Sequence, residues 1–204
     1  ATLDLGQSRG AAPDMASSGK RNSHLLADAP TATNSLICGG VTPSREPRFQ
    51  NIYPQQTTST TFQMIEPYLL KVLESYGMNN AAVTKSIVDN DGSVQHLDFL
   101  SDHEKKVLRT AFEVDQLWIV EHVSVAQKFV CQAISTNLFF NPGVKRRYVN
   151  AVHFAMWKKG CKSRYYVRTK ALASSNAFAV TNDMKDLVDY DRPELFTACL
   201  SCEG

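Results

Sequence analysis

The sequence contains no long apolar run, because no stretch approaches the roughly 18–20 residues that a membrane-spanning helix needs. Its opening residues include no initiator methionine, no basic segment and no apolar core, so they lack the pattern of a signal peptide. We therefore expect a chain without a membrane anchor or secretion signal, and one that is processed, spliced or excerpted.

Charge of one sign is also scarce. The 22 basic and 20 acidic residues leave a formal net charge of +2, and the basic cluster that stands out is the short run at 145–147. A nucleic-acid-binding chain normally carries a larger basic patch, so we expect no nucleic-acid partner. The content of 43% apolar and 21% charged residues is typical of a soluble globular chain, and 204 residues form one domain or part of a larger one.

Clustered metal ligands are missing as well. The histidines are scattered, and the cysteines comprise three single residues and one close pair: Cys38, Cys131, Cys161, Cys199 and Cys202. Zinc would need a second pair at comparable spacing, so we expect no metal in this chain. Scattered thiols without a secretion signal are typical of a cytosolic protein, and the three single cysteines are expected to be small buried residues.

The hydrophobic pattern predicts alternating strands and helices. Apolar spacing predicts strands at 24–29, 135–140 and 163–169, and helices at 62–76, 101–118, 123–131 and 146–160. Composition predicts loops at 1–22 and 41–61, turns at 89–92 and 141–143, and a tail of low intrinsic order from 171 onward. A strand, a polar turn and a helix start, followed later by helix and strand, favour part of an α/β barrel.

Hydroxyl and amide side chains gather where the first predicted strand gives way to a helix. The segment consists of Thr31, Ala32, Thr33, Asn34 and Ser35. Free N–H groups and the helix dipole at such a start attract anions such as phosphate. The simpler interpretation is N-capping by a threonine or serine, and the local pattern leaves both open.

Two adjacent tyrosines, Tyr165 and Tyr166, lie on the last predicted strand. Neighbouring side chains of a strand point to opposite faces, which predicts one core ring and one surface ring. The functional alternative is a redox pair whose phenols lie close enough to pass an electron and a proton.

A Cys-x-x-Cys pair, Cys199 and Cys202, lies close to the last residue. This spacing allows a disulfide and lowers the pKa of one thiol. On a tail, such a dithiol could visit a buried site and then a reductant in solvent. A fortuitous pair of cysteines is the alternative.

These three features, in this order, resemble the closing third of class I ribonucleotide reductase large subunits. The resemblance covers nearly the whole chain and also includes the connecting segments: RGAAPD at 9–14, KRNSHLL at 20–26, APTATNS at 29–35, QAISTN at 132–137, KGCKSRYYVRT at 159–169 and CLSCEG at 199–204. It implies an α/β fold in which residues 1–170 are the C-terminal part of the ten-stranded reductase barrel. Residues 171–204 would be a flexible tail that carries the redox-active dithiol.

The resemblance also implies a role for each feature. Residues 31–35 would bind the substrate diphosphate through side chains and backbone amides. The two tyrosines would relay the oxidising equivalent to an active-site cysteine, with Tyr165 nearer that cysteine and Tyr166 nearer the subunit interface. Cys199 and Cys202 would re-reduce the active-site disulfide, and thioredoxin or glutaredoxin would then reduce them.

Implied partners are an N-terminal part of the large subunit, a small subunit that holds the dinuclear metal-radical cofactor, and a ribonucleoside diphosphate. No cofactor is expected in this chain, and the protein is expected in the cytosol of a bacterium or of a phage-infected host.

The family's Asn-x-Cys-x-Glu segment, which carries the substrate radical, is absent, and Cys38, Cys131 and Cys161 do not match the partner thiols. Ala32 stands where relatives often have glutamate.

We therefore expect one product of a split gene, as in some phage-like reductases, or an excerpt, inactive alone. Two alternatives are a non-catalytic fragment that binds or regulates a reductase, and a stand-alone dithiol carrier. The carrier would leave residues 20–170 without a purpose.

Overall fold

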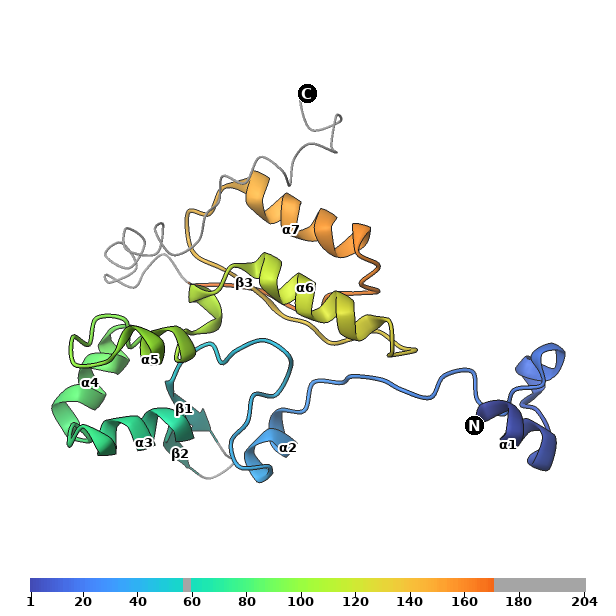
Figure 1. The fold of residues 1–204 in the computed structure, drawn as a ribbon, viewed down its shortest axis with the longest axis horizontal. Coiled ribbons are helices and arrows are strands. Elements are labelled where there is room, and N and C mark those ends of the chain that lie inside the picture. Colours follow the sequence, from blue (N-terminus) through green and yellow to red (C-terminus); the bar gives the residue numbers. More distant parts are fainter. Residues whose placement is uncertain (57–59, 171–204) are drawn as a thin grey trace.

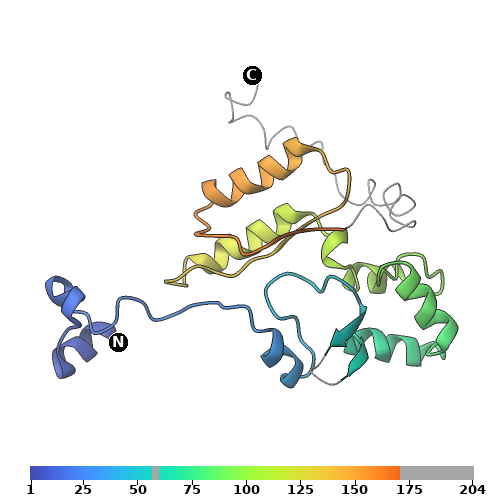
Figure 2. The same cartoon turned by 180° about the vertical axis from the view of Figure 1, so that it is seen from behind.

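The computed structural model describes residues 1–56 and 60–170. Its first part stands apart from the rest: helix α1 (Thr2–Arg9) and the 3-10 helix η1 (Pro13–Ser18) lie beyond a long extended segment in both views (Figures 1 and 2). The prediction of a loop at 1–22 is therefore wrong in part. A local signal explains the second helix, since Pro13 begins η1 with a preset φ. No residue of either helix is buried.

The segment at 24–29 is extended but not buried. Its backbone accepts hydrogen bonds from Gln132 N at Leu26 (3.0 Å) and from Ser135 N at Asp28 (2.9 Å), and Asp28 forms a parallel bridge with Ile134. Leu25 and Leu26 are 50% and 56% exposed. The prediction of a buried strand is wrong, because only one edge of the segment is paired and its apolar side chains stay uncovered.

The loop after helix α2 (Ala32–Ile37) is ordered, as predicted for the first half of 41–61. Ser44 Oγ donates to Ser135 O at 2.6 Å, and Arg45 Nε pairs with Asp28 at 2.5 Å. The second half differs from the prediction, because strand β1 (Ile52–Gln56) pairs antiparallel with β2 (Thr61–Ile65).

Helix α3 (Pro67–Ser75) begins later than predicted, because residues 61–65 belong to β2. The Glu66 side chain accepts from Leu69 N at 2.7 Å and fixes the helix start. The predicted stop is confirmed, since Gly77 adopts φ +64 directly after the helix. Helix α4 (Ala81–Asp89) was not predicted; Asn80 caps it by accepting from Val83 N.

Helix α5 (Asp102–Val107) begins where the helix at 101–118 was predicted to begin, at a capping box in which Ser101 and Glu104 exchange hydrogen bonds. The single helix expected over 101–118 is wrong. A 3-10 turn, η2 (Ala111–Glu113), and a new helix, α6 (Gln116–Gln127), follow instead. The break has a local cause, because Asp115 caps α6 by accepting from Leu117 N.

The last part forms a parallel β-α-β unit. Strand β3 (Leu138–Phe140) leads into helix α7 (Arg146–Lys158), and β4 (Val167–Thr169) returns parallel to β3. Figure 1 shows α7 beside α6, and both helices contact β3, since Phe140 meets the Tyr148 ring of α7 with centroids 6.0 Å apart. The predicted helix at 146–160 is confirmed, whereas the strands predicted at 135–140 and 163–169 form only over their last three residues.

Apolar side chains form separate clusters. One fills the space between α3, α4 and β1, around Leu69, Leu73 and Ile87. Another joins α6, α7 and β3 around Val120, Leu138 and Val152. No helix within residues 1–56 and 60–170 is long and apolar enough to cross a membrane.

Candidate functional site

The predicted anion-binding segment lies at the start of α2. Residues 31–34 are exposed and Ser35 is buried. Thr31 occupies the N-cap position, but no side chain caps the helix; instead its hydroxyl donates to Pro43 O at 3.0 Å, and Ser35 Oγ donates to Ala32 O at 2.7 Å. The simple capping interpretation is therefore wrong. The N–H groups of the first turn have no partner within the helix by its geometry.

The two tyrosines lie side by side. Their ring centroids are 4.0 Å apart at an interplanar angle of 51°, and the residues are 44% and 48% exposed. The expectation of one core ring and one surface ring is wrong. Tyr165 and Tyr166 precede the regular part of β4, so strict alternation of faces does not apply to them.

Backbone hydrogen bonds hold this pair against the strand region around β3. Tyr165 N donates to Thr136 O at 2.7 Å, and Leu138 N donates to Tyr166 O at 2.9 Å. A hydrogen bond with the Tyr166 phenol raises the pKa of Tyr165 above its ordinary value. The pair is thus a fixed contact between two phenols, each partly open to solvent.

A charged side chain adjoins the pair. The guanidinium carbon of Arg168 lies 5.2 Å from the centre of the Tyr166 ring, within the range of a cation–π interaction. Arg168 lies on β4, two residues after Tyr166, so the contact is a local one. The pattern of the sequence did not single out Arg168.

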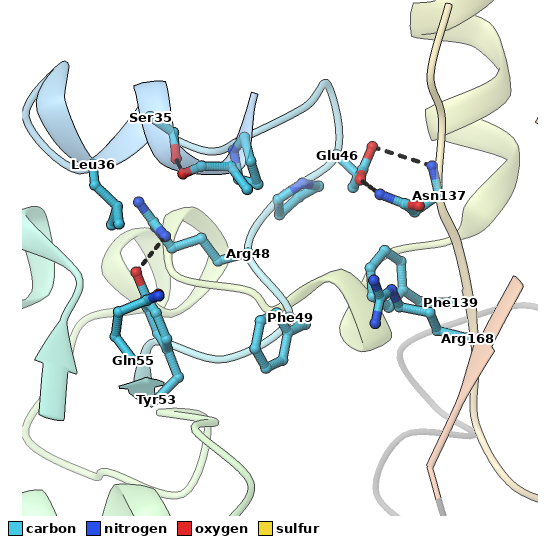
Figure 3. Close-up of a pocket in the computed structure, with 13 residues that line it drawn as sticks. Ser35, Leu36, Glu46, Arg48, Phe49, Tyr53, Gln55, Asn137, Phe139 and Arg168 are labelled. Atoms are coloured by element: carbon cyan, nitrogen blue, oxygen red, sulfur yellow. Dashed lines mark hydrogen bonds between the residues drawn. The ribbon is translucent and has the colours of Figure 1, made fainter. Parts of the chain in front are cut away.

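A cavity of about 240 Å³ lies between α2, the loop after it and the β3–β4 strands (Figure 3). Ala32 and Ser35 of α2 line one part of it, and Phe139 of β3 and Arg168 of β4 line another. The start of α2 and the strand that follows the tyrosine pair therefore border one space.

Buried polar groups shape this cavity. Glu46, 4% exposed, accepts a hydrogen bond from Asn137 Nδ2, and Asn137 N approaches its other oxygen at 3.5 Å. Arg48 donates to Tyr53 OH at 2.8 Å and to the carbonyls of Gly40 and Val41. Glu46 and Arg48 follow a proline-rich loop without periodicity, so the sequence offered no signal for them.

The remaining cysteines do not form a site in the described part of the chain. Cys199 and Cys202 lie outside the described residues. Cys38 is exposed, contrary to the prediction, and Cys131 and Cys161 are intermediate. Backbone hydrogen bonds from Leu25 and Leu26 lower the pKa of Cys131, whereas burial raises that of Cys161. Among the described residues, no group of three or more His, Cys, Asp or Glu side chains could hold a metal ion.

Comparison with known proteins gives consistent matches. A family model for the ribonucleotide reductase barrel domain matches residues 7–167. The putative ribonucleoside-diphosphate reductase large subunit of Frog virus 3 (isolate Goorha) is 41% identical over 204 residues, which is 100% of this chain and 34% of that protein. The large subunit of Invertebrate iridescent virus 3 is 40% identical, over 99% of this chain and 32% of that protein.

A solved structure agrees with these matches. The Actinobacillus ureae class Id ribonucleotide reductase alpha subunit aligns with a TM-score of 0.71 and 32% identity, and covers 87% of this chain and 32% of its own. The chain thus spans about a third of the length of these relatives. The predicted fold, part of the reductase α/β barrel, is confirmed.

Proposed function

This chain belongs to the ribonucleotide reductase family, and on that premise we propose that it forms part of the catalytic site of a ribonucleoside-diphosphate reductase. The rest of a large subunit would supply the radical-bearing cysteine and its partner thiols. The observation that carries this proposal is the contact of the two tyrosine rings at 4.0 Å.

The reaction exchanges the ribose 2′-OH for hydrogen. A ribonucleoside diphosphate and a dithiol become a deoxyribonucleoside diphosphate, water and a disulfide, so two thiols provide two electrons and two protons. The start of α2 would hold the substrate diphosphate, because residues 31–34 are exposed there and no side chain caps their helix. Anchoring the diphosphate fixes the sugar relative to the radical.

The tyrosine pair would relay the oxidising equivalent. In that step the Tyr165 phenol gives one proton and one electron to the Tyr166 phenoxyl radical, which becomes a phenol while Tyr165 becomes the radical. The ring contact at 4.0 Å supports this transfer, because it brings the two side chains close enough for an electron and a proton to pass between them. A small subunit that holds a dinuclear metal-radical cofactor would supply the oxidising equivalent to Tyr166.

The dithiol of Cys199 and Cys202 would reduce the active-site disulfide after each turnover by thiol–disulfide exchange. Thioredoxin or glutaredoxin would then reduce the new disulfide, and the cytosol is the compartment where those reductants keep thiols reduced. The proposal for these two cysteines rests on their spacing and on the family resemblance.

The test is reconstitution of the chain with an N-terminal large-subunit piece and a radical-bearing small subunit, followed by an assay of CDP reduction. We expect Tyr165→Phe and Tyr166→Phe each to lower turnover at least a hundredfold, because phenylalanine has no O–H to donate. Tyr68→Phe is the matched control, because the Tyr68 ring is exposed and Tyr68 is distant in the sequence from Tyr165 and Tyr166. Full turnover by both variants would favour the alternative, a non-catalytic fragment that binds or regulates a reductase.

A further inference from the structure

We infer that Arg168 is a positioning residue for the tyrosine pair: its guanidinium holds the Tyr166 ring against Tyr165 and makes Tyr166 the harder of the two to oxidise. This inference rests on the proposed relay. It assigns a role to a cation on β4 that neither the sequence pattern nor the family resemblance singled out.

The backbone fixes where this cation lies. Arg168 is the middle residue of β4 and pairs in register with Phe139 of β3. Tyr166 precedes it by two residues, and its carbonyl accepts from Leu138 N at 2.9 Å. Both ends of the contact are therefore tied to the same neighbouring strand, which keeps the guanidinium carbon 5.2 Å from the ring centre.

The positive charge of Arg168 acts on the Tyr166 ring. Within residues 1–56 and 60–170 no carboxylate forms an ion pair with it, and the nearby buried carboxylate of Glu46 is hydrogen-bonded to Asn137 instead. A cation over an aromatic face attracts the electron-rich ring. Oxidation removes electron density from that ring, so the cation stabilises the phenol more than the phenoxyl radical.

The position of the charge gives the relay a direction. The cation–π contact is with Tyr166, so the reduction potential of Tyr166 rises more than that of Tyr165. An oxidising equivalent that reaches Tyr166 is then favoured to pass on to Tyr165. The charge also lowers the pKa of Tyr165, against the larger effect of the hydrogen bond that raises it.

Arg168 also lines the cavity that α2 borders, so its action on the relay must be told apart from binding of the substrate. A cation there could bind the substrate diphosphate directly. The two roles differ in their kinetic effects, because a diphosphate ligand changes KM for the substrate, whereas a residue that acts on the relay changes kcat.

The experiment compares Arg168→Gln, Arg168→Lys and Arg164→Gln in the reconstituted reductase with CDP as substrate. Arg164 is the matched control, because it directly precedes the pair, is exposed and makes no cation–π contact with any ring within residues 1–56 and 60–170. We expect Arg168→Gln to lower kcat by roughly three- to tenfold with KM unchanged, Arg168→Lys to restore much of it, and Arg164→Gln to match the unaltered chain.

Three outcomes would overturn the inference. They are a raised KM with kcat unchanged, a loss in Arg168→Lys as large as in Arg168→Gln, or equal effects of the two glutamine variants. Copurification of each variant with the N-terminal large-subunit piece separates misfolding from a relay defect. A loss of kcat in Arg168→Gln that merely follows lost assembly counts against the inference.

Tyr166→Phe is assayed in parallel. If it retains turnover, the proposed function itself fails, whereas a severe loss there with no effect of Arg168→Gln rejects only the role of Arg168.

Discussion

At the scale of single residues, buried polar side chains hold the junctions between elements. Tyr148 of α7 is 2% exposed, and its hydroxyl donates to Asp115 Oδ1 at 2.5 Å while it accepts from Gln116 N at 2.9 Å. One phenol thus links α7 to the N-terminus of α6. Removal of such a group leaves a buried donor and a buried carboxylate each short of one partner.

We predict that Tyr148→Phe lowers the free energy of unfolding by about 1–3 kcal/mol, the cost of unsatisfied buried polar groups. Urea unfolding followed by circular dichroism measures it. Tyr68→Phe is the control, because an exposed ring without such partners should change stability by less than about 0.5 kcal/mol. Equal unfolding midpoints for the two variants would show that the buried hydroxyl does not link the helices.

The site could be predicted only where a residue type carries the chemistry. Adjacent tyrosines and a run of hydroxyls before a helix are visible in the sequence; the hydroxyl run falls at the start of α2 as expected, whereas the tyrosines lie just before β4. Their geometry was not visible, because alternation on a strand predicts divergent rings and the pair lies just outside the regular strand. Glu46 belongs to the site because it contacts Asn137, which is 91 residues away in the sequence. Arg168 belongs to it because it contacts Tyr166, and no pattern of the sequence marks that contact.

At the scale of elements, polar caps determine which helix boundaries are predicted correctly from the sequence and which are not. The predicted start of the helix at 101 is correct, and the Ser101–Glu104 capping box fixes it. The apolar spacing continued past Val107, which predicted one helix where the chain forms α5, η2 and α6. The spacing did not reveal that Glu113 accepts from Thr110 N at 2.8 Å and that Asp115 caps a new helix. Competing polar contacts overrode the period.

We predict that Ser101→Ala destabilises the chain by about 1 kcal/mol near neutral pH, through loss of the N-cap. Hydrogen bonds from Ser101 hold the pKa of Glu104 below its ordinary value of 4.5. A lowered carboxyl pKa stabilises the fold above the unfolded pKa, and this stabilisation is lost as pH falls through the folded pKa. The difference between variant and unaltered chain should therefore shrink below about pH 4.5.

Urea unfolding at pH 7 and at pH 3 checks this prediction. Ser17→Ala is the control, because Ser17 is exposed and has no cap to lose. A difference of constant size at both pH values would mean that the Glu104 carboxylate takes no part in the cap.

At the scale of the whole molecule, the described residues leave apolar surface and strand edges uncovered. Phe129 and Trp157 are 74% and 73% exposed, and Leu25 and Leu26 of the first extended segment are 50% and 56% exposed. Within the described ranges, the parallel pair β3–β4 forms a sheet of two strands. Parallel sheets normally have both faces covered, and exposed edges and apolar patches favour association.

We predict that the isolated chain unfolds at low temperature and that an N-terminal large-subunit piece raises its midpoint, because binding to the folded state alone stabilises that state. Differential scanning calorimetry of the chain with and without the companion measures both effects. A sharp, cooperative transition at high temperature for the isolated chain would contradict the prediction.

The central claim is that Tyr165 and Tyr166 carry a radical between polypeptides. Electron paramagnetic resonance tests it most directly, on the reconstituted complex in which 3-aminotyrosine, which is more easily oxidised than tyrosine, replaces Tyr166. The relay predicts an aminotyrosyl radical that appears with substrate as the small-subunit radical disappears, and none when Tyr68 is replaced instead. A small-subunit radical that persists unchanged, with no new radical at position 166, would contradict the claim.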